Sequence, residues 1–308
     1  MIIHTEDLVK YFGDVIALDR LNLSIPKGIS GLIGPNGAGK TTTINILVGL
    51  IKPNIGYARV FDLDCWRCSH QIKQRVGVLH ENMVFPPEFT GLHFLKHVAR
   101  IYKVPNPQKR AFEMLRFVDL DTAKDKLIKG YSAGMLKRLG LAQALIGDPE
   151  LVILDEPTAN LDPFARLQIL ERIKNLYKDK GINFVISTHV LVELEKICSW
   201  VSIINNGKIL DQGYLSDLKE KYSANIYKIV TENPERLAHE LSEIRSIENC
   251  QVEGNVIYCK INNYEFYTDF LTVAARLKTP IKVFQPMYTS LEEVYKEVIQ
   301  KNEEPISF

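Results

Sequence analysis

Eight consecutive residues, Gly34 to Thr41 (Gly-Pro-Asn-Gly-Ala-Gly-Lys-Thr), have the types and spacing of a phosphate-binding loop. Three glycines leave the backbone free to fold around a phosphate chain with its N–H groups turned inward. Lys40 can reach the β- and γ-phosphates of a nucleotide, and the Thr41 hydroxyl can hold Mg²⁺. The alternative is an ordinary glycine-rich turn, which needs no defined neighbours.

The segments on either side of the loop decide between these interpretations. Residues 29–33 (Ile-Ser-Gly-Leu-Ile) indicate a short buried strand, and residues 41–48 indicate a helix. Gly49 stands where that helix should end, and Pro53 follows it. The helix N-terminus then points at the phosphates, where its dipole favours negative charge. This context favours the phosphate-binding loop.

Further polar groups follow two other apolar segments. Asp155 and Glu156 come directly after the apolar run Leu151 to Leu154, and His189 ends the strand-like segment 183–189. Ligands of parallel α/β sheets bind at the carboxyl ends of the strands, so we expect these side chains near the loop. A surface acid pair and a buried structural histidine are the alternatives.

The order of elements predicts an α/β fold in which a parallel sheet is wrapped by helices. Residues 2–25 alternate in the strand manner, with a turn expected at residues 10–13, and predict an N-terminal antiparallel β subdomain. Residues 83–146 predict a mostly helical insertion, in which Thr90 and Ser132 are natural N-caps and prolines 105 and 107 break a helix.

A second unit is expected after the nucleotide-type pattern ends near residue 213. Its predicted elements are a strand (226–230), a helix (234–244), a hairpin (250–252 with 256–260), a helix (264–277), a strand (281–284) and a helix (291–299). The order βαββαβ plus a final helix is that of a small ferredoxin-like α+β domain. We therefore expect two domains, residues 1–217 and 218–308.

Composition bounds the function classes. The 308 residues are 46% hydrophobic and 24% charged, as in an ordinary globular chain. The net charge of +1 argues against a nucleic-acid-binding surface over the whole protein and leaves a local basic patch open; we expect no nucleic-acid partner. With no run of 18 apolar residues and no signal-peptide pattern, we expect neither a transmembrane helix nor a leader. The five scattered cysteines predict reduced thiols of a cytoplasmic protein. Cys65-x-x-Cys68 and the His93/His97 pair lack the further ligands of a zinc site.

Taken in order, these motifs resemble the ATP-binding subunit of an ABC transporter over residues 2 to about 213. Residues 34–41 match its Walker A loop, and residues 151–156 match its Walker B strand with the acid that follows. Residues 131–135 (Tyr-Ser-Ala-Gly-Met) are similar to the ABC signature, and Leu161-Asp162 to the D-loop. The resemblance implies an α/β fold with a P-loop NTPase (RecA-like) parallel-sheet core.

Roles carry over residue by residue from this resemblance. His189 matches the switch histidine, Phe12 the aromatic that stacks on the base, and Glu81 the glutamine of the Q-loop. The residues that would act in hydrolysis are Glu156 as general base, His189 and Lys40. Those that would hold Mg²⁺ are Thr41, Glu81 and Asp155. Those that would bind ATP are Phe12, Gly34, Pro35, Asn36, Gly37, Ala38, Gly39, Lys40, Thr41, Thr42, Ser132, Gly134 and Asp162.

The sequence departs from the family pattern at three places. Glu81 replaces a glutamine, which adds negative charge near Asp155 and Glu156 and would either tighten Mg²⁺ binding or change the coupling of the helical region. Ala133 and Met135 replace a glycine and a glutamine of the signature. The retained Ser132 and Gly134 still offer a hydroxyl and a backbone N–H at a helix N-terminus, and these suit a γ-phosphate.

The resemblance implies an ATPase subunit that energises transport through separate membrane subunits. The signature variant and a C-terminal segment ending in Ser-Leu-Glu-Glu-Val (290–294) are similar to exporter-type systems. One signature and one Walker A per chain imply two such chains, identical or related, with ATP between them, on the inner face of the cell membrane. The rivals are an ABC ATPase acting on ribosomes or DNA, a P-loop kinase or GTPase, and a regulator that binds ATP without turnover. An ABC ATPase of ribosomes or DNA would show tandem cassettes, and a kinase or GTPase would lack the signature. A regulator without turnover would lack the acid at position 156.

Overall fold

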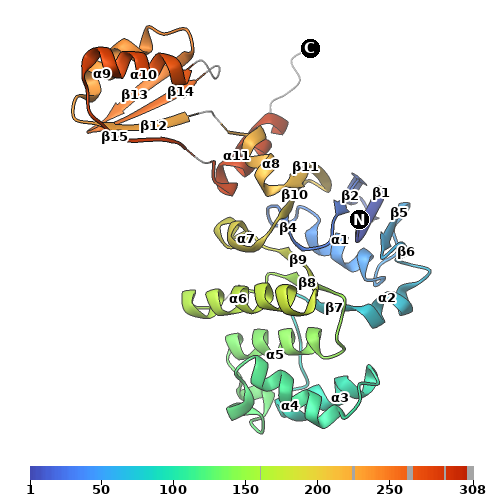
Figure 1. Cartoon of the computed structure of the whole chain (residues 1–308). Helices are drawn as coiled ribbons and strands as arrows, with labels where there is room; N and C mark the ends of the chain where they lie inside the picture. The colour runs from blue at the N-terminus through green and yellow to red at the C-terminus, as the bar shows by residue number, and fades with distance from the viewer. Residues whose placement is uncertain (160, 224–225, 262–265, 288, 304–308) are drawn as a thin grey trace. The chain divides into compact units, whose positions relative to one another are not determined.

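The computed structural model describes residues 1–159, 161–223, 226–261, 266–287 and 289–303, shown in Figure 1. Contacts between Cα atoms divide the chain into two compact units. The first contains Met1–Ser216 together with the segment from Val298 onward, and the second contains Asp217–Glu297. That residues 218–308 fold independently stays a prediction, and residues 304–308 of that range lie outside the described residues.

The first unit is organised around a six-stranded sheet of order β11-β10-β4-β9-β8-β7. The strands are β4 (Ile29–Ile33), β7 (Val76–Leu79), β8 (Leu151–Asp155), β9 (Asn183–Ser187), β10 (Trp200–Asn205) and β11 (Lys208–Tyr214). All pair in parallel except β11, which is antiparallel to β10. Every residue of β4, β8 and β9 is buried, because helices cover both faces of a parallel sheet. The predicted α/β fold with a parallel core is confirmed.

The N-terminal strands form a second, antiparallel sheet. It contains β1 (Ile3–Phe12), β2 (Val15–Leu21), β5 (Ile55–Val60) and β6 (Leu63–Asp64) in the order β2-β1-β5-β6, and β3 (Ser24–Ile25) also pairs with β1. The turn predicted over residues 10–13 is wrong, since Lys10 to Phe12 continue β1 and pair with β2. The reversal falls at Gly13, whose φ of 57° an L side chain rarely adopts.

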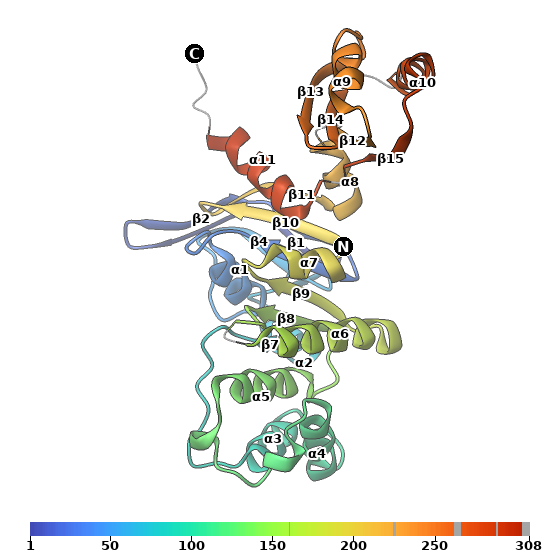
Figure 2. The same cartoon turned by 90° about the vertical axis from the view of Figure 1, so that its left-hand side faces the viewer.

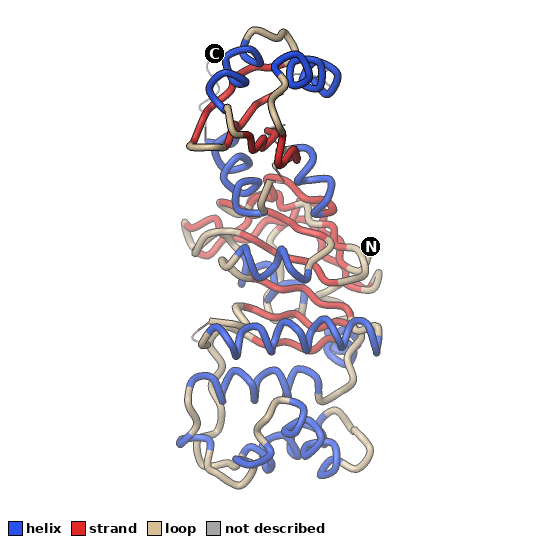
Figure 3. Tube along the Cα trace, turned by 60° about the vertical axis from the view of Figure 1, so that its left-hand side comes forward, coloured by secondary structure: helices blue, strands red, loops and turns tan. Residues whose placement is uncertain are grey.

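Helices flank these strands, as the blue and red segments of Figure 3 show. The helices of the first unit are α1 (Lys40–Leu47), α2 (Ser69–Arg75), α3 (Gly91–Ile101), α4 (Pro107–Phe117), α5 (Ala133–Leu145), α6 (Pro163–Lys180) and α7 (Leu191–Ile197). Of these, α3, α4 and α5 form the predicted insertion and lie beyond the β7 edge of the sheet (Figures 1 and 2). Helix α8 (Leu215–Lys221) begins in the first unit and continues into the second.

The predicted N-caps of the insertion are confirmed, and one proline behaves differently from the expectation. The hydroxyls of Thr90 and Ser132 accept hydrogen bonds from the backbone N–H groups of His93 and Met135. Pro107 does not break a helix but begins α4, a position where the N–H that proline lacks has no helical partner.

The second unit has the predicted βαββαβ order. Its elements are β12 (Ile226–Thr231), α9 (Pro234–Ser242), β13 (Ile247–Glu253), β14 (Val256–Ile261), α10 (Phe266–Leu277) and β15 (Ile281–Pro286), and α11 (Leu291–Glu303) follows. The sheet order is β13-β14-β12-β15 with antiparallel pairing throughout, which confirms the ferredoxin-like arrangement. The predicted start of α10 at residue 264 lies outside the described residues.

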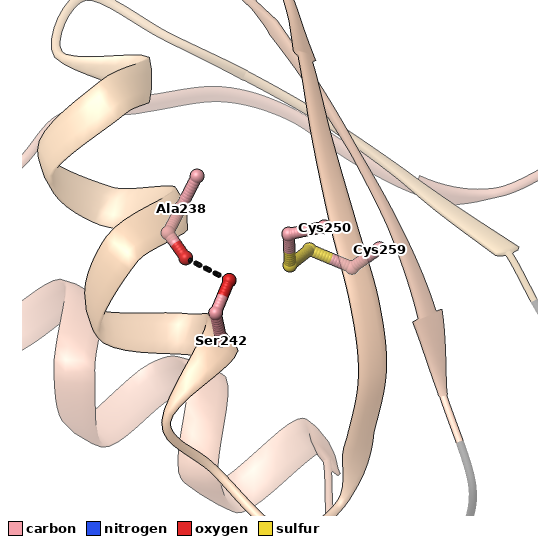
Figure 4. The surroundings of a disulfide bond; sticks show 4 residues. All are labelled: Ala238, Ser242, Cys250 and Cys259. Atoms are coloured by element: carbon pink, nitrogen blue, oxygen red, sulfur yellow. Dashed lines mark hydrogen bonds between the residues drawn. A yellow bond between two sulfur atoms is a disulfide. The ribbon is translucent and has the colours of Figure 1, made fainter.

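One expectation about the cysteines is wrong. Cys250 and Cys259 form a disulfide between β13 and β14, on the face of the hairpin turned toward α9 (Figure 4). The two residues lie directly opposite each other in the strand register, with Cα atoms 4.3 Å apart. Cys65, Cys68 and Cys198 are free thiols, and burial raises the pKa of Cys65 to about 12.

Candidate functional site

The predicted site residues come from neighbouring parallel strands. In the order β7, β8, β9, β4, the carboxyl ends of these strands lead into Glu81, Glu156, His189 and the loop from Gly34. Parallel strands end at a common edge, so the sheet topology gathers these segments on one side of the molecule.

Two glycines of the phosphate-binding loop are required by the surrounding chain. Gly39 caps the N-terminus of α1 with φ 105° and ψ 3°, and a Cβ there would lie 2.8 Å from the carbonyl oxygen of Ala17. A Cβ at Gly34 would lie 2.2 Å from the carbonyl oxygen of Ile204. The β1–β2 hairpin and β10 therefore both press against the loop, and they fix its path.

Lys40 braces this loop from inside. Its ammonium group donates to the carbonyl oxygens of Gly34 at 2.7 Å and Pro35 at 3.0 Å, and the residue is 7% exposed. A charged amine that bonds two carbonyls of the loop is close enough to exchange them for phosphate oxygens.

Opposing electrostatic effects act on the Lys40 ammonium. Burial lowers its pKa, and the negative charges of Glu156, Asp155 and Glu81 oppose that shift, in decreasing order of effect. Three of the four predicted acids of the site are thus near enough to Lys40 to act on its charge, and Asp162 is not among them.

Thr41 and Asp155 meet directly. The Thr41 hydroxyl donates to Asp155 Oδ2 at 2.9 Å, although 114 residues separate them in the chain. Asp155 is buried at the end of β8, and Thr42 is half-buried in the first turn of α1. The pair places two oxygen ligands side by side next to the loop.

Glu156 is the first residue after β8. Its φ of 49° is left-handed, and its N–H donates to the Ser187 carbonyl at 2.8 Å. The carboxylate is buried: Oε2 accepts from Thr188 Oγ1 at 3.2 Å, and Oε1 lies 2.9 Å from His189 Nδ1. A carboxylate only accepts, so His189 carries its hydrogen on Nδ1 when this bond forms. Thr188 was missed by the sequence analysis.

The Q-loop position has a partner that sequence reasoning also missed. Lys137 on α5 donates from Nζ to the Glu81 carbonyl oxygen at 2.9 Å. Burial lowers the Lys137 pKa, and the charges of Glu81, Asp155 and Glu156 oppose this effect. Among the described residues, no hydrogen bond joins the exposed Glu81 carboxylate to Thr41 or Asp155, so the structure does not bring this predicted metal ligand to the other two.

The signature and D-loop residues begin two helices. Ser132 caps α5, and Asp162 caps α6 by accepting from two backbone N–H groups at 3.0 and 2.9 Å. A Cβ at Gly134 would lie 3.2 Å from Leu161 Cδ2, so the two segments are neighbours. Within the described chain, the hydrogen bonds of Ser132 and Asp162 do not reach the phosphate-binding loop.

The predicted base-stacking residue is accessible. Phe12 is 49% exposed near the end of the β1–β2 hairpin, and Lys10 Nζ lies 4.9 Å from its ring centroid. The same hairpin contributes Ala17 and Leu18 to the contacts around Gly39, so Phe12 belongs to the element that borders the loop.

Comparison with known proteins gives a consistent result. The family described as "ABC transporter" matches residues 18–159, and the "ATP-binding protein DrrA1-3-like, C-terminal domain" matches residues 213–299. The bacitracin transport ATP-binding protein BcrA of Bacillus licheniformis is 38% identical over 221 residues, 71% of this chain and 72% of the relative. The Nod factor export ATP-binding protein I of Paraburkholderia xenovorans (strain LB400) is 32% identical over 280 residues, 90% of this chain and 89% of the relative.

A solved structure with the same fold as the first unit supports this result. It is that of an ATP-binding subunit of an ABC transporter, with a TM-score of 0.66 and 28% identity, and the match covers 72% of this chain and 93% of that chain. The resemblance inferred from the motifs is confirmed. On these matches, the chain belongs to the ABC transporter family and is one of its ATP-binding ATPase subunits.

Proposed function

We propose that this chain hydrolyses Mg-ATP at the carboxyl edge of its sheet, paired with a second ATPase chain, to drive export through separate membrane subunits. The observation that carries the proposal is the pair of hydrogen bonds from Thr188 and His189 to the buried Glu156 carboxylate. Asp155, the residue before it, is hydrogen-bonded to Thr41. A nucleotide-binding regulator without turnover needs no such carboxylate.

In the proposed reaction a water oxygen bonds to the γ-phosphorus while the bond from that phosphorus to the β–γ bridging oxygen breaks. Glu156 accepts the water proton, and His189 Nδ1 holds the Glu156 carboxylate at 2.9 Å. For His189 to contact the γ-phosphate as well, its Nε2 must also carry a hydrogen, as it does in the protonated ring. Lys40 exchanges its carbonyl partners for β- and γ-phosphate oxygens and offsets their charge.

The residues present fit a magnesium ion. A threonine hydroxyl and a carboxylate 2.9 Å apart are the oxygen ligands that Mg²⁺ takes, with nucleotide phosphates and waters completing its shell. Among the described residues no three His, Cys, Asp or Glu side chains gather in a metal-binding group, which suits an ion held mainly by its nucleotide. The bound ion would offset phosphate charge as a Lewis acid. Glu81 is proposed as a further ligand that would have to move to the ion when it binds; it follows β7, the strand next to the one that ends at Asp155.

The second chain is proposed from the signature. The α5 N-terminus, with Ser132 at its cap, is suited to an anion, yet its hydrogen bonds do not involve its own phosphate-binding loop. The N-terminus of α5 in one chain would therefore close on the γ-phosphate held by Lys40 of the other, with Gly134 and Asp162 at the same contact. The two chains are identical or related.

Membrane partners and export are proposed from the relatives. Two of them are named for bacitracin transport and for Nod factor export. In the part of the chain that the structure describes, no helix is long and apolar enough to span a bilayer. We place the chain at the cytoplasmic face of the membrane, with the insertion after Glu81 against the membrane subunits, and we propose no nucleic-acid partner.

Glu156→Gln tests hydrolysis and pairing together. The amide keeps the size of the side chain but cannot accept a proton at neutral pH, so the variant should bind Mg-ATP, barely hydrolyse it and accumulate as a dimer. Size-exclusion chromatography with light scattering measures the dimer, and a phosphate-release assay measures turnover. Glu235→Gln, an exposed acid at the start of α9, is the matched control and should behave as wild type.

Two results contradict separate parts of the proposal. Wild-type turnover by Glu156→Gln would remove this residue as the base. A variant that binds ATP tightly yet stays monomeric would remove pairing by the isolated subunit. Adding Ser132→Arg should abolish the dimer, because a bulky cation would occupy the cap that faces the phosphate.

A further inference from the structure

A buried hydrogen bond joins the chain that follows Glu156 to the helix that follows His189. Thr158 is 1% exposed, and its hydroxyl donates to Glu193 Oε2 at 2.6 Å. Glu193 lies on α7, four residues after His189, and is 9% exposed. A buried carboxylate destabilises a protein unless it is paired or hydrogen-bonded. The Glu193 carboxylate therefore depends on its hydrogen-bonding partners to stay buried.

Arg166 on α6 completes the cluster. Its Nη1 lies 3.6 Å from Glu193 Oε1, and its Nε donates to the Leu161 carbonyl oxygen at 2.9 Å. The Glu193 carboxylate thus accepts a hydrogen bond from the Thr158 hydroxyl through Oε2 and pairs with the Arg166 guanidinium through Oε1. The three side chains, Thr158, Glu193 and Arg166, are called the Glu193 cluster below.

The Glu193 cluster joins the same two chain segments as the hydrogen bonds of Glu156 in the proposed site. Glu156 is held by Thr188 and His189, which precede α7, while Thr158 and Leu161, which follow Glu156, are held by the cluster. The same two chain segments are therefore joined twice. Two connections restrict relative rotation and translation of the segments far more than one hydrogen bond does.

We propose that Glu193 is a positioning residue for ATP hydrolysis, which through Thr158 and Arg166 holds the segment after Glu156 and the segment containing His189 in one fixed relation. The inference rests on the proposed function, in which Glu156 is the base and His189 holds it. Loss of the cluster leaves the nucleotide-binding groups Lys40 and Thr41 untouched, so it should reduce turnover without weakening ATP binding.

The test is a set of substitutions in the full-length chain. Thr158→Val removes the hydroxyl at constant shape, Thr158→Ser retains it, and Glu193→Leu removes the carboxylate. We expect Thr158→Val and Glu193→Leu each to lower kcat roughly tenfold while KM for ATP and the Kd of Mg-ATP stay within about twofold, since small misplacements of a base cost this much or more. Thr158→Ser should restore most of the lost kcat.

A double variant and a matched control separate positioning from stability. Thr158→Val and Glu193→Leu break the same connection, so the double variant should lose little beyond either single variant. Thr5 is an equally buried threonine whose hydroxyl donates to the Leu21 carbonyl at 2.9 Å in the antiparallel sheet. Thr5→Val should lower the melting temperature to a similar extent yet leave kcat unchanged.

Several results would overturn the inference. They are wild-type kcat in folded Thr158→Val, losses that multiply in the double variant, a rise in KM in place of the fall in kcat, or an equal fall in kcat for Thr5→Val. If Glu193→Leu does not fold, the Thr158→Val and Thr158→Ser comparison still decides. Glu156→Gln, measured in the same assay, distinguishes failure of the inference from failure of the proposed function. If Glu156→Gln is inactive and Thr158→Val is fully active, only the positioning role is rejected. If Glu156→Gln is active, the proposed base is rejected.

Discussion

Gly39→Ala should destabilise the first unit strongly, because two separate effects act at that position. The φ of 105° lies in a region that L residues avoid, at a free-energy cost of about 1–2 kcal/mol. The added methyl group would also lie 2.7 Å from Leu18 Cδ2 and 2.8 Å from the Ala17 carbonyl oxygen. Backbone atoms of a paired strand move only at a cost, and overpacking of this kind costs about 1–3 kcal/mol. The free energy of unfolding should therefore fall by about 2–5 kcal/mol.

Urea unfolding measures this loss, with Gly13→Ala as the matched control. Gly13 has a φ of 57°, but a Cβ there would meet nothing within 4 Å, so only the backbone effect of about 1–2 kcal/mol should remain. Gly39→Ala should also weaken ATP binding, since it displaces the cap of α1. Equal urea midpoints for the two variants would refute the steric argument.

Two other substitutions test separate features. Phe12→Ala should weaken ATP binding by about 1–3 kcal/mol, the value of a base–aromatic stack, and an unchanged Kd by calorimetry would instead make Tyr11 the candidate. Glu150→Gln should remove a two-fold hydrogen-bonded contact with Arg75, at 2.6 and 2.9 Å, that is exposed and so contributes less than about 1 kcal/mol. The hydrogen bond from Arg75 lowers the pKa of Glu150, so its contribution is fully present above about pH 5 and is lost as pH falls through the folded value. Urea midpoints of Glu150→Gln and wild type should converge in acid, and a difference that grows in acid would contradict this sign.

The elements that local sequence governs were predicted well. The strand Ile29–Ile33 has the expected bounds, because an apolar run flanked by turn residues determines both ends. Ser132 and Thr90 cap their helices as expected, since capping depends only on the next three residues. The phosphate-binding loop stays a prediction of the same local kind, since its motif and the strand and helix beside it lie within residues 29–53.

The features that were missed depend on contacts between distant segments. The Lys137 ammonium and the Glu81 carbonyl are 56 residues apart, and the side chains of Thr158 and Glu193 are 35 apart. Neither pair has a periodic pattern, and each becomes visible only once the sheet order places β7, β8 and β9 side by side. The Cys250–Cys259 disulfide was missed because it depends on the exact strand register, and a shift of one residue would turn the two thiols to opposite faces.

The backbone at Glu156 also has a consequence for how this chain can be improved or can evolve. A residue other than glycine at φ 49° carries strain that glycine at the same position would not. Loss of the carboxylate would relieve that strain but leave the hydrogen-bonding groups of Thr188 and His189 without their partner, and under the proposed function it would also remove the base. Backbone strain and side-chain hydrogen bonds therefore act on stability with opposite signs at Glu156, so a search for stabilised variants that keep the proposed activity is best made with this position held fixed.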